Sequence, residues 1–66
     1  MTLRIYTNKD TIDITTSASI KMEDILSQME DGNLVLIETI YRTTFIINCL
    51  NINAIEIINT NIIPPI

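Results

Sequence analysis

The chain has 66 residues, a formal net charge of −4, 47% hydrophobic residues, no histidine and one cysteine. One cysteine excludes an internal disulfide, and without histidine the chain cannot assemble the usual ligand set of a zinc site. Its few basic residues are scattered singly, which argues against phosphate binding by a monomer. So short a chain buries only about 60% of its unfolded surface, so we expect a homo-oligomer or a protein partner to add stability.

Two absences bear on location. The sequence contains no run of about 18 apolar residues, and its first residues lack the pattern of a signal peptide. The unpaired Cys49 favours a reducing compartment. We therefore expect a cytoplasmic protein with no membrane segment.

Isoleucine dominates the apolar residues, with sixteen copies against five leucines and one valine. Its branched side chain is stiff at χ1 and packs well on a pleated surface, so the composition predicts a sheet protein. The abundance of isoleucine and asparagine also favours an AT-rich genome, such as that of a bacterium or a phage.

The first fourteen residues predict a β-hairpin. Residues 2–6 and 11–15 alternate apolar and polar side chains, as half-buried strands do. The polar stretch 7–10 between them is typical of a turn.

The pattern then changes to that of an amphipathic helix. Ser17 and Ser19 are candidate N-caps, and Ile20 can form a hydrophobic staple if the helix starts at Lys21. Gly32 stands where a left-handed residue would end the helix. Four apolar residues at helical spacing form one stripe: Met22, Ile25, Leu26 and Met29.

Two continuous apolar runs follow, at residues 34–37 and 45–47, and they predict strands covered on both faces. One face can meet the helix, and the other needs the opposite wall of a barrel or another subunit. The linking residues 40–43 lack the Gly or Asn of a tight hairpin, so we expect a loose turn or strands that extend past the core. Tyr41 and Arg42 at this tip are candidate contact residues, with a simple solvated turn as the alternative.

The end of the domain bends before a last strand. Asn48 interrupts an apolar run, and Asn51 and Asn53 occupy turn-forming positions, so we expect a corner or bulge before a strand at 54–58. The fold class is α+β: a small, strongly bent antiparallel sheet or an SH3/Sm-like barrel of about five strands, with one helix and the order β-β-α-β-β-β.

A strand, an Ile-Asn corner, an isoleucine a few residues on and an Ile-Glu strand occur in that order. In this respect the chain resembles small bacterial proteins of the flagellar FlbD type and related Sm-like barrels. Residues 2–31 resemble the other half of such a protein, in permuted order. The resemblance implies an architecture and no functional residue. The residues that carry it are Phe45, Ile47, Asn48, Ile52, Ile55 and Glu56.

We divide the chain into a single domain at residues 1–58 and an apolar, proline-containing C-terminal tail at residues 59–66. Prolines cannot join the interior of a sheet, and the tail's isoleucines are poorly suited to water. The tail can dock on a neighbouring subunit, cover the open edge of its own barrel, or be disordered. Its candidate interface residues are Ile62, Ile63, Pro64, Pro65 and Ile66.

Enzyme chemistry has little basis in the sequence. Cys49 lies in an apolar stretch and has no histidine to activate it, so we interpret it as a small buried hydrophobe. With one glycine, a glycine-rich phosphate loop is excluded. Glu38 and Glu56 interrupt apolar strands, and each is expected at an exposed edge or paired with Arg4 or Arg42. We predict no catalytic site, cofactor or metal.

Two functional classes remain. The first is a small, self-associating interaction or regulatory protein that acts by binding another protein. A variant of this class is an acidic inhibitor that mimics nucleic acid, which the modest charge disfavours. The second class is an Sm-like, oligomeric nucleic-acid-binding protein whose ring gathers its few basic side chains.

Overall fold

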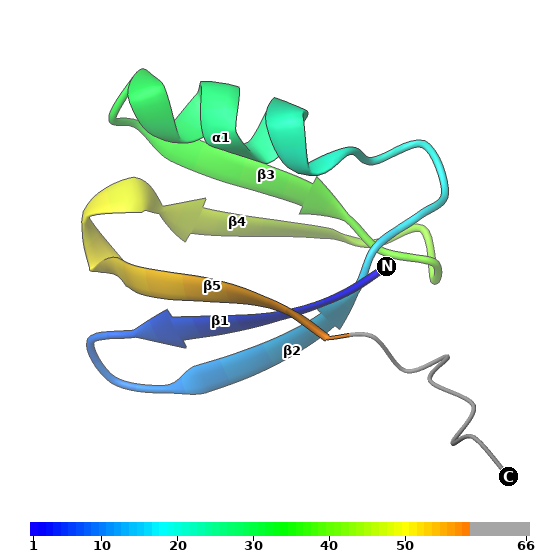
Figure 1. Cartoon of the computed structure of the whole chain (residues 1–66), viewed down its shortest axis with the longest axis horizontal. Helices are drawn as coiled ribbons and strands as arrows, with labels where there is room; N and C mark the ends of the chain where they lie inside the picture. Colours follow the sequence, from blue (N-terminus) through cyan, green and yellow to red (C-terminus); the bar gives the residue numbers. More distant parts are fainter. Residues whose placement is uncertain (59–66) are drawn as a thin grey trace, which may run out of the picture.

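The computed structural model describes residues 1–58 and shows five strands and one α-helix in the predicted order (Figure 1). The α+β class and the order β-β-α-β-β-β are confirmed. A 3-10 turn at Cys49–Asn51 forms the predicted corner. The elements are β1 (Thr2–Thr7), β2 (Thr11–Thr15), α1 (Met22–Glu30), β3 (Leu34–Glu38), β4 (Thr44–Asn48) and β5 (Ile52–Ile58).

The strands form two antiparallel sheets, one with the order β2-β1-β5 and one made of β3 and β4. A single bridge between Thr16 and Thr39 joins the end of β2 to the end of β3. Within residues 1–58, β4 pairs with β3 alone. The sheet is therefore bent but not closed, so the chain adopts the first of the two predicted architectures and not the barrel.

The turn between β1 and β2 is organised by Thr7. Its backbone N–H donates to the carbonyl of Asp10 at 2.8 Å, and its hydroxyl accepts from the backbone N–H of Asp10 at 2.9 Å. A hydroxyl that bonds the backbone of its own turn stabilises a tight reversal. The predicted hairpin is confirmed.

Helix α1 begins later than the serine caps predict. Its N-cap is Lys21, whose side chain makes no capping hydrogen bond, so the prediction of Ser17 or Ser19 as the cap is wrong. Ile20 instead packs against the core, as a hydrophobic staple does. Gly32 adopts φ +73° just after the helix, as predicted from its place in the sequence.

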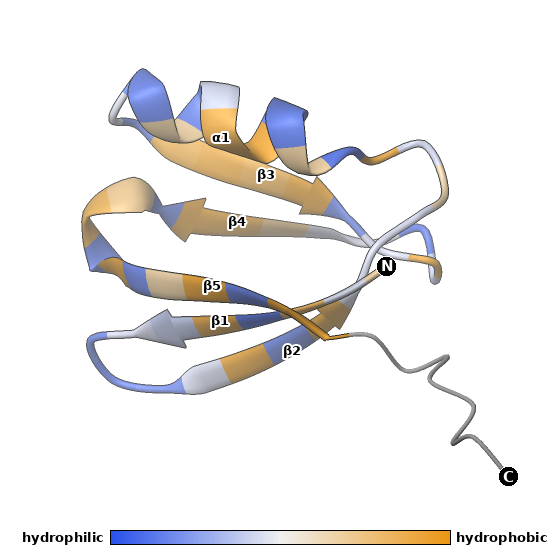
Figure 2. Ribbon diagram, in the orientation of Figure 1, coloured by the Kyte–Doolittle hydropathy of each residue, from blue (hydrophilic) through white to orange (hydrophobic). Residues whose placement is uncertain are grey.

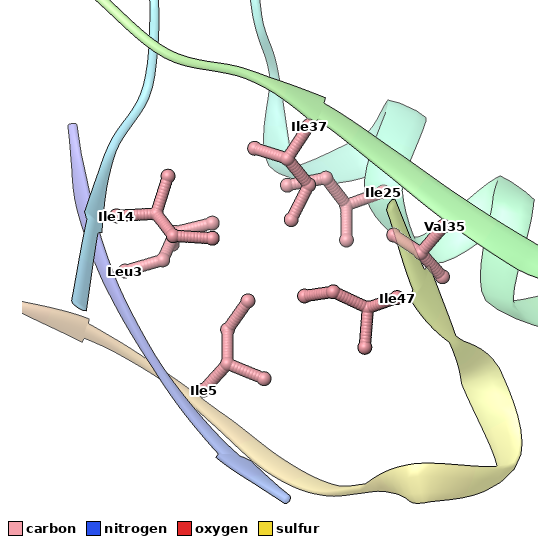
Figure 3. Close-up of a cluster of buried hydrophobic side chains, with 7 residues drawn as sticks. All are labelled: Leu3, Ile5, Ile14, Ile25, Val35, Ile37 and Ile47. Atoms are coloured by element: carbon pink, nitrogen blue, oxygen red, sulfur yellow. The ribbon is translucent and has the colours of Figure 1, made fainter. Parts of the chain in front are cut away.

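The core lies between the three-stranded sheet on one side and α1 with β3 and β4 on the other (Figure 3). The helix contributes one fully buried residue, while Met22 and Met29 pack around it and Leu26 stays half exposed. Burying such branched side chains is the main favourable term in folding. The core residues are Leu3, Ile5, Ile14, Ile25, Val35, Ile37 and Ile47.

The turn between β3 and β4 is tight, so of the two expected alternatives the loose turn is wrong. The backbone N–H of Thr39 donates to the carbonyl of Thr43 at 2.8 Å, and that of Arg42 donates to the carbonyl of Thr39 at 3.1 Å. Arg42 takes φ +61°, a region that favours glycine. The hydrogen bonds of the two threonines hold a shape that the local sequence does not favour.

No helix in residues 1–58 is long and apolar enough to cross a membrane.

Candidate functional site

The outer face of the β3–β4 sheet is apolar and exposed. Leu36 lies opposite Ile46 in the register, and Leu34 lies two residues before Leu36 on the same face. The exposed fractions are 52% for Leu34, 47% for Leu36 and 61% for Ile46. We call these three residues the outer face. Residues 1–58 bury only one side of each strand, so the predicted second cover is missing from this part of the chain.

The other sheet, in contrast, exposes polar side chains to solvent on its outer surface. Arg4 forms a two-pronged ion pair with Asp13, at 2.9 Å and 3.1 Å, and the Tyr6 hydroxyl donates to Glu56 at 3.0 Å. In Figure 2, most of β3 is hydrophobic, whereas β1 and β2 alternate. The contrast marks the outer face as a surface suited to contact rather than to water.

The partner of Arg4 differs from both expected carboxylates. Asp13 faces Arg4 across β1 and β2, and Glu56 faces it across β1 and β5. Arg4 bonds Asp13, while Glu56 accepts from the Tyr6 hydroxyl. The hydrogen bonds from Arg4 lower the pKa of Asp13 below its ordinary value, and those bonds raise the pKa of Arg4 in turn. Of the two alternatives for Glu38 and Glu56, pairing with Arg4 is therefore not found. Glu38 and Glu56 are exposed, in keeping with the edge alternative.

A helix side chain covers the outer edge of β3. The Gln28 amide donates to the carbonyl of Leu36 at 3.1 Å and accepts from the backbone N–H of Leu36 at 2.8 Å. The amide therefore occupies the place of a neighbouring strand at this position. Such covering prevents a sheet edge from pairing with another chain.

The outer edge of β4 has no comparable cover. Because the backbone groups of Leu36 point to Gln28, the Leu36–Ile46 pair is a pair without mutual hydrogen bonds. The N–H and C=O of Ile46 consequently point away from β3, and no hydrogen bond within residues 1–58 engages them. β4 also lacks the charges and prolines that protect edge strands, whereas β2 and β5 carry Asp13 and Glu56.

A cavity of about 350 Å³ lies beside this free edge. One wall is β4 from Phe45 to Asn48, and the other is the β1–β2 turn with Ile12 of β2. Asn51 also lines it, and the backbone N–H of Asn8 donates to the carbonyl of Asn51 at 3.1 Å. We call this cavity, together with the edge of β4, the β4 slot. Its walls combine apolar side chains with unpaired backbone groups, as in sites that bind extended peptides.

The predicted contact residues lie apart from the β4 slot. Tyr41 is 78% exposed at the tip of the β3–β4 hairpin, next to the strained Arg42. Neither residue lines the cavity, which adjoins the opposite end of β4. The predicted tail contacts, residues 62–66, lie outside the described residues.

Cys49 and the carboxylates form no evident chemical site in the described part of the chain. The thiol is partly buried and lies 3.5 Å from the carbonyl oxygen of Met29. Among residues 1–58, no group of three potential metal ligands comes together.

Sequence reasoning missed Gln28 and the β4 slot. A lone glutamine on a helix gives no local sign of the strand it will meet. The free edge did leave a signal, because Thr44–Asn48 is a strand with neither charge nor proline.

Comparison with known proteins finds no match, whether by family model, among curated proteins or among solved structures. The resemblance to FlbD-type and Sm-like proteins therefore gains no support from these comparisons.

Proposed function

We propose that this chain is a small, non-enzymatic interaction protein that associates with itself and acts by binding another protein. The observation that carries the proposal is the exposure of Leu34, Leu36 and Ile46 on one sheet face. Sheets of this kind normally turn polar side chains to water, as the other sheet of this chain does. The unpaired Cys49 supports a reducing, cytoplasmic setting.

The size of the outer face sets what it can contribute. Fully burying one large aliphatic side chain is worth about 1.5–3 kcal/mol, so each half-exposed residue can add about 1 kcal/mol. Three residues in each of two copies then provide about 6 kcal/mol. Association costs about 4–15 kcal/mol in lost freedom of motion. The outer face therefore approaches but does not clearly exceed that cost, and a stable complex needs further contacts.

The first test measures mass against concentration by sedimentation equilibrium. We expect the full chain to associate at tens of micromolar, and a chain with both Leu36→Thr and Ile46→Thr to be monomeric under the same conditions. Threonine keeps the strand preference and removes apolar area. The matched control is Leu50→Thr, since Leu50 is 79% exposed but lies in the 3-10 turn. A wild-type chain that stays monomeric and binds no protein would refute the proposal.

Salt dependence separates this proposal from nucleic-acid binding. Apolar association should be unchanged or stronger between about 0.1 and 0.5 M NaCl, whereas phosphate binding weakens steeply with salt. Nucleic-acid binding has less support, because Arg4 is already paired with Asp13 and the chain is acidic. An inhibitor that mimics nucleic acid would instead bind a basic protein and lose affinity in salt.

A further inference from the structure

We infer that the β4 slot binds residues 59–66 of a second copy of this chain as an added strand. This inference rests on the proposed self-association and names the contacts through which it occurs. The segment reads Asn-Thr-Asn-Ile-Ile-Pro-Pro-Ile and carries no charged side chain.

The edge of β4 offers one backbone donor and one acceptor at the same residue. The N–H and C=O of Ile46 point outward and have no partner within residues 1–58. An extended segment satisfies such a pair by strand addition. Ile63 suits this position, because a residue that precedes proline is restricted to extended backbone. Pro64 and Pro65 then end the pairing, since neither has an N–H to donate.

The cavity beside this edge matches the side chains of the segment. Phe45, Ile47 and Ile12 line it, and isoleucine side chains can pack against them. A volume of about 150 Å³ already holds a molecule of benzene's size, so the 350 Å³ here has room for more than one aliphatic side chain.

Charge is compatible with the same occupant. Lys9 and Asp10 are the charged residues that line the cavity, and their opposite charges cancel. An uncharged segment therefore enters without an electrostatic penalty from the walls. Two whole copies repel each other weakly, because each has a net charge of −4.

Distance favours a second copy over the same chain. Thr7, on the far wall of the cavity, pairs with Ile52 at the start of β5. β5 then runs six residues farther to Ile58, a distance of about 20 Å. Ile63, the residue placed at the edge of β4, follows Ile58 by five residues, which span at most about 18 Å, so it falls short of that wall within its own chain. The segment of another copy has no such constraint.

The test uses the full chain with one substitution in each partner of the contact. Ile63→Asp places a charge in the added segment and leaves residues 1–58 unchanged. Ile46→Pro removes the outward N–H of β4 without breaking a pairing to β3, as proline at an edge strand allows. It is compared with Ile46→Thr, which loses the same outer-face side chain but keeps the N–H. Ser19→Asp is the matched control, because it adds the same charge at an exposed loop residue.

Sedimentation equilibrium and peptide binding provide the two measurements. We expect Ile63→Asp relative to the wild-type chain, and Ile46→Pro relative to Ile46→Thr, to raise the dissociation constant of self-association about tenfold or more, and Ser19→Asp to change it less than about twofold. A labelled peptide with the sequence of residues 59–66 should bind the Ile63→Asp chain, and the same peptide with Ile63→Asp should not. Circular dichroism checks that Ile46→Pro remains folded.

The outcomes separate this inference from the proposed function. If the wild-type chain associates and the Ile63→Asp chain associates equally well, the tail contact is refuted while self-association stands. If the peptide binds but the full chain remains monomeric, the second-copy contact is refuted. A wild-type monomer that binds neither peptide nor protein refutes both proposals.

Discussion

Replacing Gln28 tests whether one helix side chain protects the edge of β3. The Gln28 amide makes two hydrogen bonds to the backbone of Leu36, at 2.8 Å and 3.1 Å. Gln28→Met keeps a side chain of similar length and helix preference but removes both bonds. The change therefore isolates the hydrogen bonds from the packing of α1 on β3.

The expected loss follows from those two bonds. Each is worth about 0.5–1.5 kcal/mol net, for a sum of about 1–3 kcal/mol. Water can replace part of this, because both bonds lie near the surface. We therefore expect the free energy of unfolding to fall by about 1–2 kcal/mol, which corresponds to a Tm lower by roughly 5–15 °C in a domain of this size.

Urea denaturation followed by circular dichroism measures this loss. The slope of the free energy of unfolding against urea concentration should stay unchanged. The control is Ser27→Ala, at an exposed neighbouring residue of the same helix. It should shift the free energy of unfolding by less than about 0.5 kcal/mol. If Gln28→Met has no larger effect than this control, water replaces both hydrogen bonds to the backbone of Leu36. Gln28 then does not protect the edge of β3.

Three other predictions concern stability. Ile25→Ala should lower the free energy of unfolding by about 2–5 kcal/mol in urea denaturation. Leu26→Ala, at a residue that is 51% exposed, should lower the free energy of unfolding far less, and equal losses would contradict the described core. Arg42→Gly should raise the free energy of unfolding by about 0.5–1 kcal/mol, and with it the Tm, because glycine accepts φ +61° without strain. A lower Tm would contradict this. Because the pKa of Asp13 is lowered in the folded chain, its ion pair with Arg4 stabilises the fold at pH values above the ordinary pKa of 3.8, and this stabilisation is lost as the pH falls through the lowered pKa. Between about pH 5 and pH 2, the urea midpoint should therefore fall less in Asp13→Asn than in the wild-type chain. Parallel pH profiles of the two chains would refute the link.

The tight turn between β3 and β4 could not be predicted from the local sequence. The sequence of residues 40–43 contains no residue that prefers positive φ, yet Arg42 adopts it. Hydrogen bonds from Thr39 to Thr43 close the hairpin, and strand pairing on either side enforces the geometry. Strain that persists in this way is often associated with function, which keeps Tyr41 and Arg42 as candidate contacts.

The sequence by itself determined the elements and their order. Alternating residues predicted the first hairpin, a helical spacing predicted α1, and Gly32 predicted its end, because each of these depends on neighbours close in the chain. Uncharged Thr44–Asn48 even contained a sign of the unprotected edge.

Only the tertiary structure decided which face of β3 and β4 is buried. Leucine, valine and isoleucine occupy both faces, so hydrophobicity could not choose between Val35 with Ile37 and Leu34 with Leu36. The choice came from the tertiary packing of α1 and the three-stranded sheet, which cover one side of these strands. The Gln28 bonds, the Arg4–Asp13 pair and the β4 slot arose in the same way, because each depends on which distant residues the register and packing bring together.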